Sequence, residues 1–114
     1  LGDGAGGPEP TDMALGLIIN NNFHGSWRSN VAKFIIILTD APPSGDDDYF
    51  TADDELVIAA HTTTCQAQGI KVCVLGSQYE GASLWSNFAI ATGGGTSPDY
   101  AGSSIIGLLQ EGCD

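Results

Sequence analysis

Two runs of apolar residues predict strands that are buried on both faces. Residues 32–39 contain five consecutive apolar side chains, three of them isoleucine, and residues 70–76 form a second, mainly apolar run. Uninterrupted runs rich in β-branched residues are typical of parallel strands that helices cover on both faces. The first run ends in Thr39 and Asp40, and the two prolines that follow prevent its continuation.

Helical spacing predicts four helices around these strands. We expect a first helix over residues 11–19, with Thr11 as its cap and Asp12 in its first turn. A second helix is expected from a threonine cap at position 51 to about residue 68. Gly69, the next residue, is expected to end it. The remaining expected elements are a helix over 82–91, a short strand over 96–100 and a helix over 103–110.

The alternation of helices with buried strands predicts an α/β fold: a three-layer (αβα), doubly wound, Rossmann-like and mainly parallel sheet with helices on both faces. The chain of 114 residues has the length of one domain, and 42% apolar residues are enough for a core. In such sheets ligands bind beyond the carboxyl ends of the strands, where Asp40 is expected. Its carboxylate can face a cation or a substrate there, or it can cap the turn before the prolines.

Acidic residues dominate the charge of the chain. The 14 Asp and Glu residues stand against Arg28, Lys33 and Lys71, which gives a formal net charge of −11. Binding to nucleic acid needs clustered Lys and Arg, so we do not expect nucleic acid as a partner, and anionic membrane surfaces are disfavoured for the same reason. A cation or a basic protein surface fits this charge, and so does a plain role of the acids in keeping a secreted protein soluble.

Several features favour an extracellular or cell-surface location. Lysine is scarce, whereas Gly, Ser, Thr and Asn are abundant. The chain starts at Leu1 without a signal peptide pattern, so we expect that processing or truncation removed what came before, and no run is long enough to insert into a bilayer. Cys65, Cys73 and Cys113 form no CxxC pair, which argues against zinc. Their odd number suggests a disulfide to another segment or chain, or a free thiol.

Other candidate motifs do not predict catalysis. The glycine-rich start matches GxGxxG, but no strand precedes it and prolines follow it, so it does not predict nucleotide binding. His24 and His61 could serve a catalytic set, yet no GxSxG elbow is present, and His61 is expected mid-helix and partly exposed. The acids at 46–48 lack the spacing of a calcium loop and are expected to be solvated, whereas Cys73 is expected in the core. We therefore do not predict an enzyme.

Four segments, taken in order, resemble the von Willebrand factor type A family, including the related domains of integrin β subunits. They are residues 6–15, which read Gly-Gly-Pro-Glu-Pro-Thr-Asp-Met-Ala-Leu, residues 33–43 with the buried strand, residues 69–76, and residues 90–94, which read Ile-Ala-Thr-Gly-Gly. The resemblance spans nearly the whole chain. It implies that residues 1–114 are the C-terminal part of such a domain, incomplete at the N-terminus and without the first strand.

The resemblance also implies a metal-ion-dependent adhesion site at the end of the sheet. In the family three loops supply the ligands: a DxSxS after the first strand, a threonine that Thr11 matches, and an aspartate that Asp40 matches. Glu9 is a further candidate, because integrin β domains use a glutamate in a similar segment. The metal would be Mg²⁺, or Mn²⁺ or Ca²⁺, and its binding is conditional on a DxSxS segment, which these residues do not contain.

The function that the resemblance implies is an extracellular adhesion module that binds a protein ligand without catalysis. An acidic side chain of that ligand would complete the coordination of the metal. The alternative is a structural building block of a filament, matrix or surface assembly that uses no metal. We expect the chain to be a fragment of a longer protein, or a partner chain to complete the sheet or to form a disulfide with it.

Overall fold

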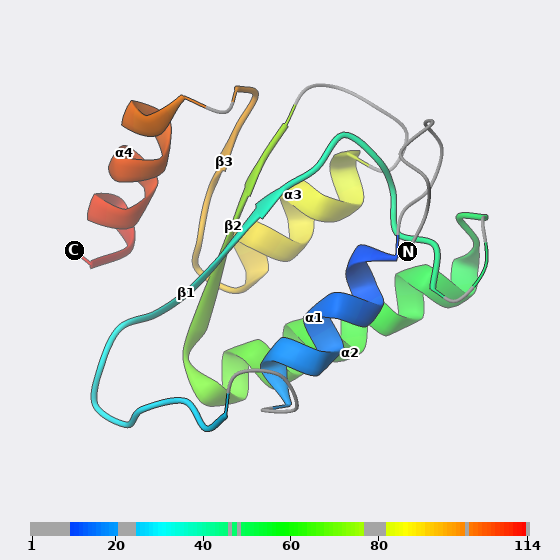
Figure 1. Cartoon of the computed structure of the whole chain (residues 1–114), viewed down its shortest axis with the longest axis horizontal. Coiled ribbons are helices and arrows are strands. Elements are labelled where there is room, and N and C mark those ends of the chain that lie inside the picture. Colours follow the sequence, from blue (N-terminus) through cyan, green and yellow to red (C-terminus); the bar gives the residue numbers. More distant parts are fainter. Residues whose placement is uncertain are drawn as a thin grey trace.

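The computed structural model describes residues 10–20, 25–45, 47, 49–76, 82–99 and 101–113 of the chain. They form a small α/β fold around one sheet (Figure 1). Its strands, in spatial order, are β1 (Lys33–Leu38), β2 (Ile70–Leu75) and β3 (Thr96–Ser97). All neighbouring strands are parallel, and the register pairs Lys33 with Ile70 and Leu38 with Leu75.

The helices are α1 (Thr11–Ile19), α2 (Ala52–Gln68), α3 (Ala82–Ala91) and α4 (Gly102–Cys113). The predicted parallel α/β class is confirmed, because a helix separates each strand from the next and the paired strands are parallel. β1 and β2 lie within the predicted runs, since apolar, β-branched residues suit strands that other elements cover. β3 is shorter than predicted, and α4 continues beyond residue 110, where the helical pattern was expected to end.

One face of the sheet carries the main core. Because side chains alternate along a strand, Ile35 and Ile37 of β1 point to the same face, as do Val72 and Val74 of β2. The helices add Leu15, Ile19, Ile58, Cys65, Trp85, Phe88 and Ala89 to this core. Both α1 and α3 pack against α2, so these three helices cover the same face (Figure 1).

Helix α4 contacts the opposite face at a few positions. The ring of Phe34 lies against Gly112 of α4, where an added β-carbon would come within 2.6 Å of it. Lys71 also points to this face, and its ammonium group donates to the Gly112 carbonyl. Leu108 of α4 reaches Gly95, which precedes β3. α4 therefore touches the second face of the sheet through these residues, while Leu38 on the same face stays exposed.

Local chemistry explains where α2 begins and ends, but not where α1 begins. The Asp54 carboxylate accepts from the Thr51 N–H at 2.8 Å, and Gly69 ends α2 in the left-handed region with a φ of 70°. Both predicted ends of α2 are confirmed. The prediction that Thr11 caps α1 is wrong, because Pro10 is the cap residue and Thr11 is the first residue of the helix. The restricted φ of proline is compatible with a helix start, so the helical pattern can begin directly after it.

Candidate functional site

Asp40 lies two residues past the end of β1, after Thr39, and has an exposed side chain. The pairing of β1 with β2 extends past the strand, because the Thr39 N–H donates to the Leu75 carbonyl at 3.1 Å. The Thr39 hydroxyl then bonds to both the N–H and the carbonyl of Ala41, each at 3.2 Å. The turn is thus stabilised by the buried Thr39 and not by Asp40. The Asp40 carboxylate is exposed at the edge where parallel sheets bind ligands.

Two hydrogen bonds join the segment that follows β1 to helices in the described part of the chain. The Trp85 indole N–H, on α3, donates to the Ala41 carbonyl at 2.9 Å. The Gly45 N–H donates to the Asp12 carboxylate, on α1, at 3.0 Å. The residues between these two points are buried. Figure 1 shows this segment running from the end of β1 to a position beside the start of α1.

Thr11, the other predicted metal ligand, is half-buried at the first position of α1. It lies at the same end of the molecule as Asp40, because the segment after β1 reaches the first turn of α1. Within the described part of the chain, no hydrogen bond joins the side chains of Thr11 and Asp40. Their hydroxyl and carboxylate groups are hard oxygen donors, which is the type that Mg²⁺ binds. The further candidate Glu9 and the acids Asp46 and Asp48 lie outside the described residues.

Two buried acids at this end of the molecule were not anticipated from the sequence. Asp12 is 0% exposed and Asp54 is 5% exposed, whereas acids in first helical turns are expected at the surface. Asp12 is buried where α1 packs on α2 and where Gly45 approaches it. No local signal reveals this, because the partner residue lies far away in the chain. Asp47, by contrast, is exposed, as expected for the acidic loop.

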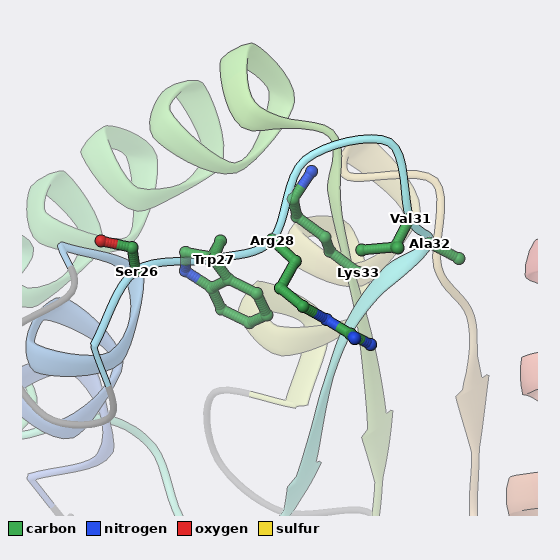
Figure 2. A pocket seen from close by; sticks show the side chains of 6 residues that line it. All are labelled: Ser26, Trp27, Arg28, Val31, Ala32 and Lys33. Atoms are coloured by element: carbon green, nitrogen blue, oxygen red, sulfur yellow. The ribbon is translucent and has the colours of Figure 1, made fainter.

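An open pocket lies at the opposite end of β1 (Figure 2). It has a volume of about 330 Å³ and is lined by Ser26, Trp27, Arg28, Val31, Ala32 and Lys33. Figure 2 shows the Arg28 guanidinium and the Lys33 ammonium pointing in different directions, so the two cations do not converge on one anion. Because β1 begins at Lys33, the length of the strand separates this pocket from Asp40. The pocket is therefore distinct from the candidate site.

The potentially reactive side chains of α2 have structural surroundings. His61 is half-buried, as expected, and its Nε2 lies 2.8 Å from the Asp12 carbonyl oxygen. Cys65, one turn later, is fully buried, and this burial raises the pKa of its thiol from 9.0 to about 11. Cys73 of β2 is buried too, which confirms its predicted place in the core, and both thiols are free. These side chains therefore take part in the packing of the fold.

Within the described ranges, no group of three His, Cys, Asp or Glu side chains is arranged to hold a metal ion. No helix in the same part of the chain is long and apolar enough to cross a membrane. His24 and the side chain of Cys113 lie outside the described residues.

Comparison of the chain with family models, with curated proteins and with solved structures found no match. The case for a function therefore depends on the arrangement of the residues themselves.

Proposed function

We propose that the chain is an adhesion or protein-binding module of the von Willebrand factor type A kind. It binds its partner, without catalysis, at the end of the sheet where β1 ends. The observation that carries this proposal is the exposed carboxylate of Asp40, which lies two residues past the end of an apolar parallel strand. Ligands of parallel α/β sheets bind beyond the carboxyl ends of the strands, and Asp40 is the acid at that position on β1.

The finer assignment of the fold belongs to the same proposal. A doubly wound αβα sheet that lacks its first strand would leave an open edge beside the strand that precedes Asp40. β1 is the outer strand in the described order β1-β2-β3, which is consistent with such a gap. The helices on both faces of the parallel sheet also support the assignment. In the family, the strand that precedes DxSxS is central, and the open edge of β1 is where it would pair.

A Mg²⁺ ion, or Mn²⁺ or Ca²⁺, would be held by the Thr11 hydroxyl and the Asp40 carboxylate, together with ligands from a DxSxS segment. Such an ion supplies an electrophilic centre that can accept a carboxylate from a protein partner. The neighbouring residues of this chain position the Thr11 hydroxyl and the Asp40 carboxylate. α1 holds Thr11 at its first position, and the bonds between Thr39 and Ala41 hold the backbone on both sides of Asp40.

Isothermal titration of the full-length protein that contains this chain with MgCl₂ and MnCl₂ tests the site. We expect binding in the wild type and its loss in Asp40→Ala, because the substitution removes a charged oxygen ligand. Asp47→Ala is the matched control, since Asp47 is an exposed acid on the same connection between β1 and α2. Binding of equal strength in Asp40→Ala and in the wild type would show that the metal assignment is wrong.

A second candidate function, assembly without metal, is favoured by a different observation. β1 is an edge strand of the described sheet, and its Leu38 side chain is 57% exposed. Apolar edge strands pair readily with strands of other chains. A subunit of an extracellular filament, matrix or surface array could use this edge, so that a partner chain completes the sheet.

Size-exclusion chromatography with light scattering, in the presence of EDTA, tests the assembly function. We expect concentration-dependent association that Leu38→Lys weakens, because a charge on an edge strand opposes pairing. Leu56→Lys is the control, since Leu56 is 68% exposed on α2, away from the sheet edge. A monomer at all concentrations, or equal association in both variants, would argue against the edge as an interface.

A further inference from the structure

Two buried carboxylates approach each other around Gly45, and a buried serine precedes that glycine. Asp12, Ser44 and Asp54 are 0%, 1% and 5% exposed. Asp12 belongs to the first turn of α1 and Asp54 to the first turn of α2. The three residues thus bring together the two helices and the segment that follows β1. None of them belongs to the proposed adhesion site at Thr11 and Asp40.

The position of Gly45 shows how close the two carboxylates are. A β-carbon placed on Gly45 would lie 2.9 Å from Asp54 Oδ1 and 3.9 Å from Asp12 Oδ2. Both oxygens therefore lie within 4 Å of one point. Gly45 has a φ of 63°, in the left-handed region that favours glycine. The absence of a side chain lets the loop pass directly beside both acids.

The hydrogen bonds in this cluster leave several of its oxygen atoms free. Asp12 Oδ1 accepts from the Gly45 N–H at 3.0 Å, and Asp54 Oδ2 accepts from the Thr51 N–H at 2.8 Å. Asp12 Oδ2 and Ser44 Oγ are buried and have no hydrogen-bond partner among the described residues. Buried polar atoms are nearly always satisfied, so two unpartnered oxygens in one region point to a ligand.

Among the described residues, no basic side chain balances the charge of these acids. Lys71 bonds to α4, and Arg28 and Lys33 line the pocket at the other end of β1. The ring of His61 bonds to the backbone carbonyl of Asp12 and not to its carboxylate. The dipoles of α1 and α2 stabilise acids in their first turns, but two buried like charges close together need a stronger compensation.

We propose that Asp12, Ser44 and Asp54 bind a divalent cation, with Ca²⁺ as the preferred ion. Two carboxylates and a hydroxyl are hard oxygen donors, and the two negative charges match a doubly charged ion. Ca²⁺ accepts irregular sets of about six to eight oxygens at about 2.3–2.6 Å, whereas Mg²⁺ keeps several waters in a strict octahedron. The ion joins the segment after β1 to the first turns of α1 and α2, and it needs no DxSxS.

Calorimetric titration of the EGTA-treated chain with CaCl₂, together with thermal unfolding with and without CaCl₂, tests this site. The wild type binds Ca²⁺ and unfolds at a higher temperature in its presence. Asp12→Asn keeps an acceptor for the Gly45 N–H but removes the charge, so it weakens Ca²⁺ binding by roughly tenfold or more. Asp53→Asn is the matched control, because Asp53 is exposed in the same helical turn as Asp54 and its loss leaves the affinity unchanged.

A second variant keeps the test decisive if Asp12→Asn does not fold. Ser44→Ala removes one oxygen donor without changing the charge, and Ca²⁺ binding weakens several-fold. The proposal is overturned if Ca²⁺ neither binds to the wild type nor raises its unfolding temperature, or if Asp12→Asn and Ser44→Ala both keep the wild-type affinity. Asp40→Ala separates this site from the adhesion site, since it removes Mg²⁺ or Mn²⁺ binding there and leaves the Ca²⁺ effect in place.

Discussion

The imidazole Nε2 of His61 lies 2.8 Å from the carbonyl oxygen of Asp12, and this contact joins α2 to the first turn of α1. The same ring lies over Gly16 of α1, where an added β-carbon would be 3.3 Å from Cε1. α1 can approach α2 this closely because Gly16 carries no side chain. The contact therefore positions the helix that begins with Thr11 and Asp12, on which both proposed cation sites depend.

Replacement of His61 by alanine should destabilise the fold. His61→Ala removes the hydrogen bond to Asp12 and part of the packing between the helices, so we expect a loss of about 1–3 kcal/mol in the free energy of unfolding. Urea denaturation followed by circular dichroism measures this loss. Thr63→Ala is the control, because Thr63 is exposed on α2 and bonds only to a carbonyl of its own helix, and we expect a change within about 0.5 kcal/mol. Equal effects would contradict the role of His61.

Two glycine-to-alanine substitutions should have opposite effects. A β-carbon on Gly94 would overlap the Val72 carbonyl of β2, so Gly94→Ala forces the connection between α3 and β3 away from the sheet. We expect a loss of about 3 kcal/mol or more. Gly107 lies within α4 with nothing within 4 Å of its added β-carbon, and Gly107→Ala should gain about 0.5–1 kcal/mol from helix propensity. Thermal unfolding of both variants checks the signs, and stabilisation by Gly94→Ala would refute this packing of the turn.

The indole of Trp85 should hold the segment after β1 in place. Trp85→Phe removes the donor to the Ala41 carbonyl and leaves a small cavity in a fully buried position, so we expect a loss of about 2–4 kcal/mol. Trp27→Phe provides the comparison, since Trp27 is only half-buried beside the open pocket, and its effect should be smaller. Denaturation by guanidinium, followed by circular dichroism, ranks the two variants. The reverse order would mean that the Ala41 bond contributes little.

The thiol of Cys65 should be inert in the folded protein. Burial raises its pKa to about 11, so it stays protonated and hardly reacts with iodoacetamide near neutral pH. A thiol whose pKa is higher in the folded than in the unfolded state gives stability that is complete below its ordinary pKa. That contribution is lost as the pH rises from 9.0 towards 11. Cys65→Ala should lack this part of the alkaline decline, and rapid labelling at Cys65 itself in the native wild type would contradict the burial.

The elements that local chemistry determines could be predicted from the sequence. The runs that form β1 and β2 are apolar and β-branched, and α2 has a polar start at Thr51 and a glycine stop at Gly69. Elements that depend on distant contacts were predicted less well. α4 extends past residue 110 because Gly112 fits against the Phe34 ring of β1, and no periodic pattern reveals that fit.

In the candidate sites, too, the features set by local sequence could be predicted, and those that depend on distant contacts could not. The position of Asp40 at the end of β1 followed from the strand and the prolines after it, but the turn contacts of Thr39 were found only in the structure. Asp12 and Asp54 look like ordinary first-turn acids in the sequence. Their burial depends on the approach of Gly45 and on the packing of α1 against α2, which are properties of the folded chain and not of any local motif.

Helix α4 contributes no residue to the main core, and its described contacts with the sheet centre on Phe34, Lys71 and Gly95. We therefore expect α4 to detach and return while α1, α2 and α3 stay packed on the other face of the sheet. Amide hydrogen exchange in α4 would then report a local opening of low free energy, well below that of global unfolding. Each opening would uncover the ring of Phe34, so the second face of the sheet is an intermittently accessible apolar surface.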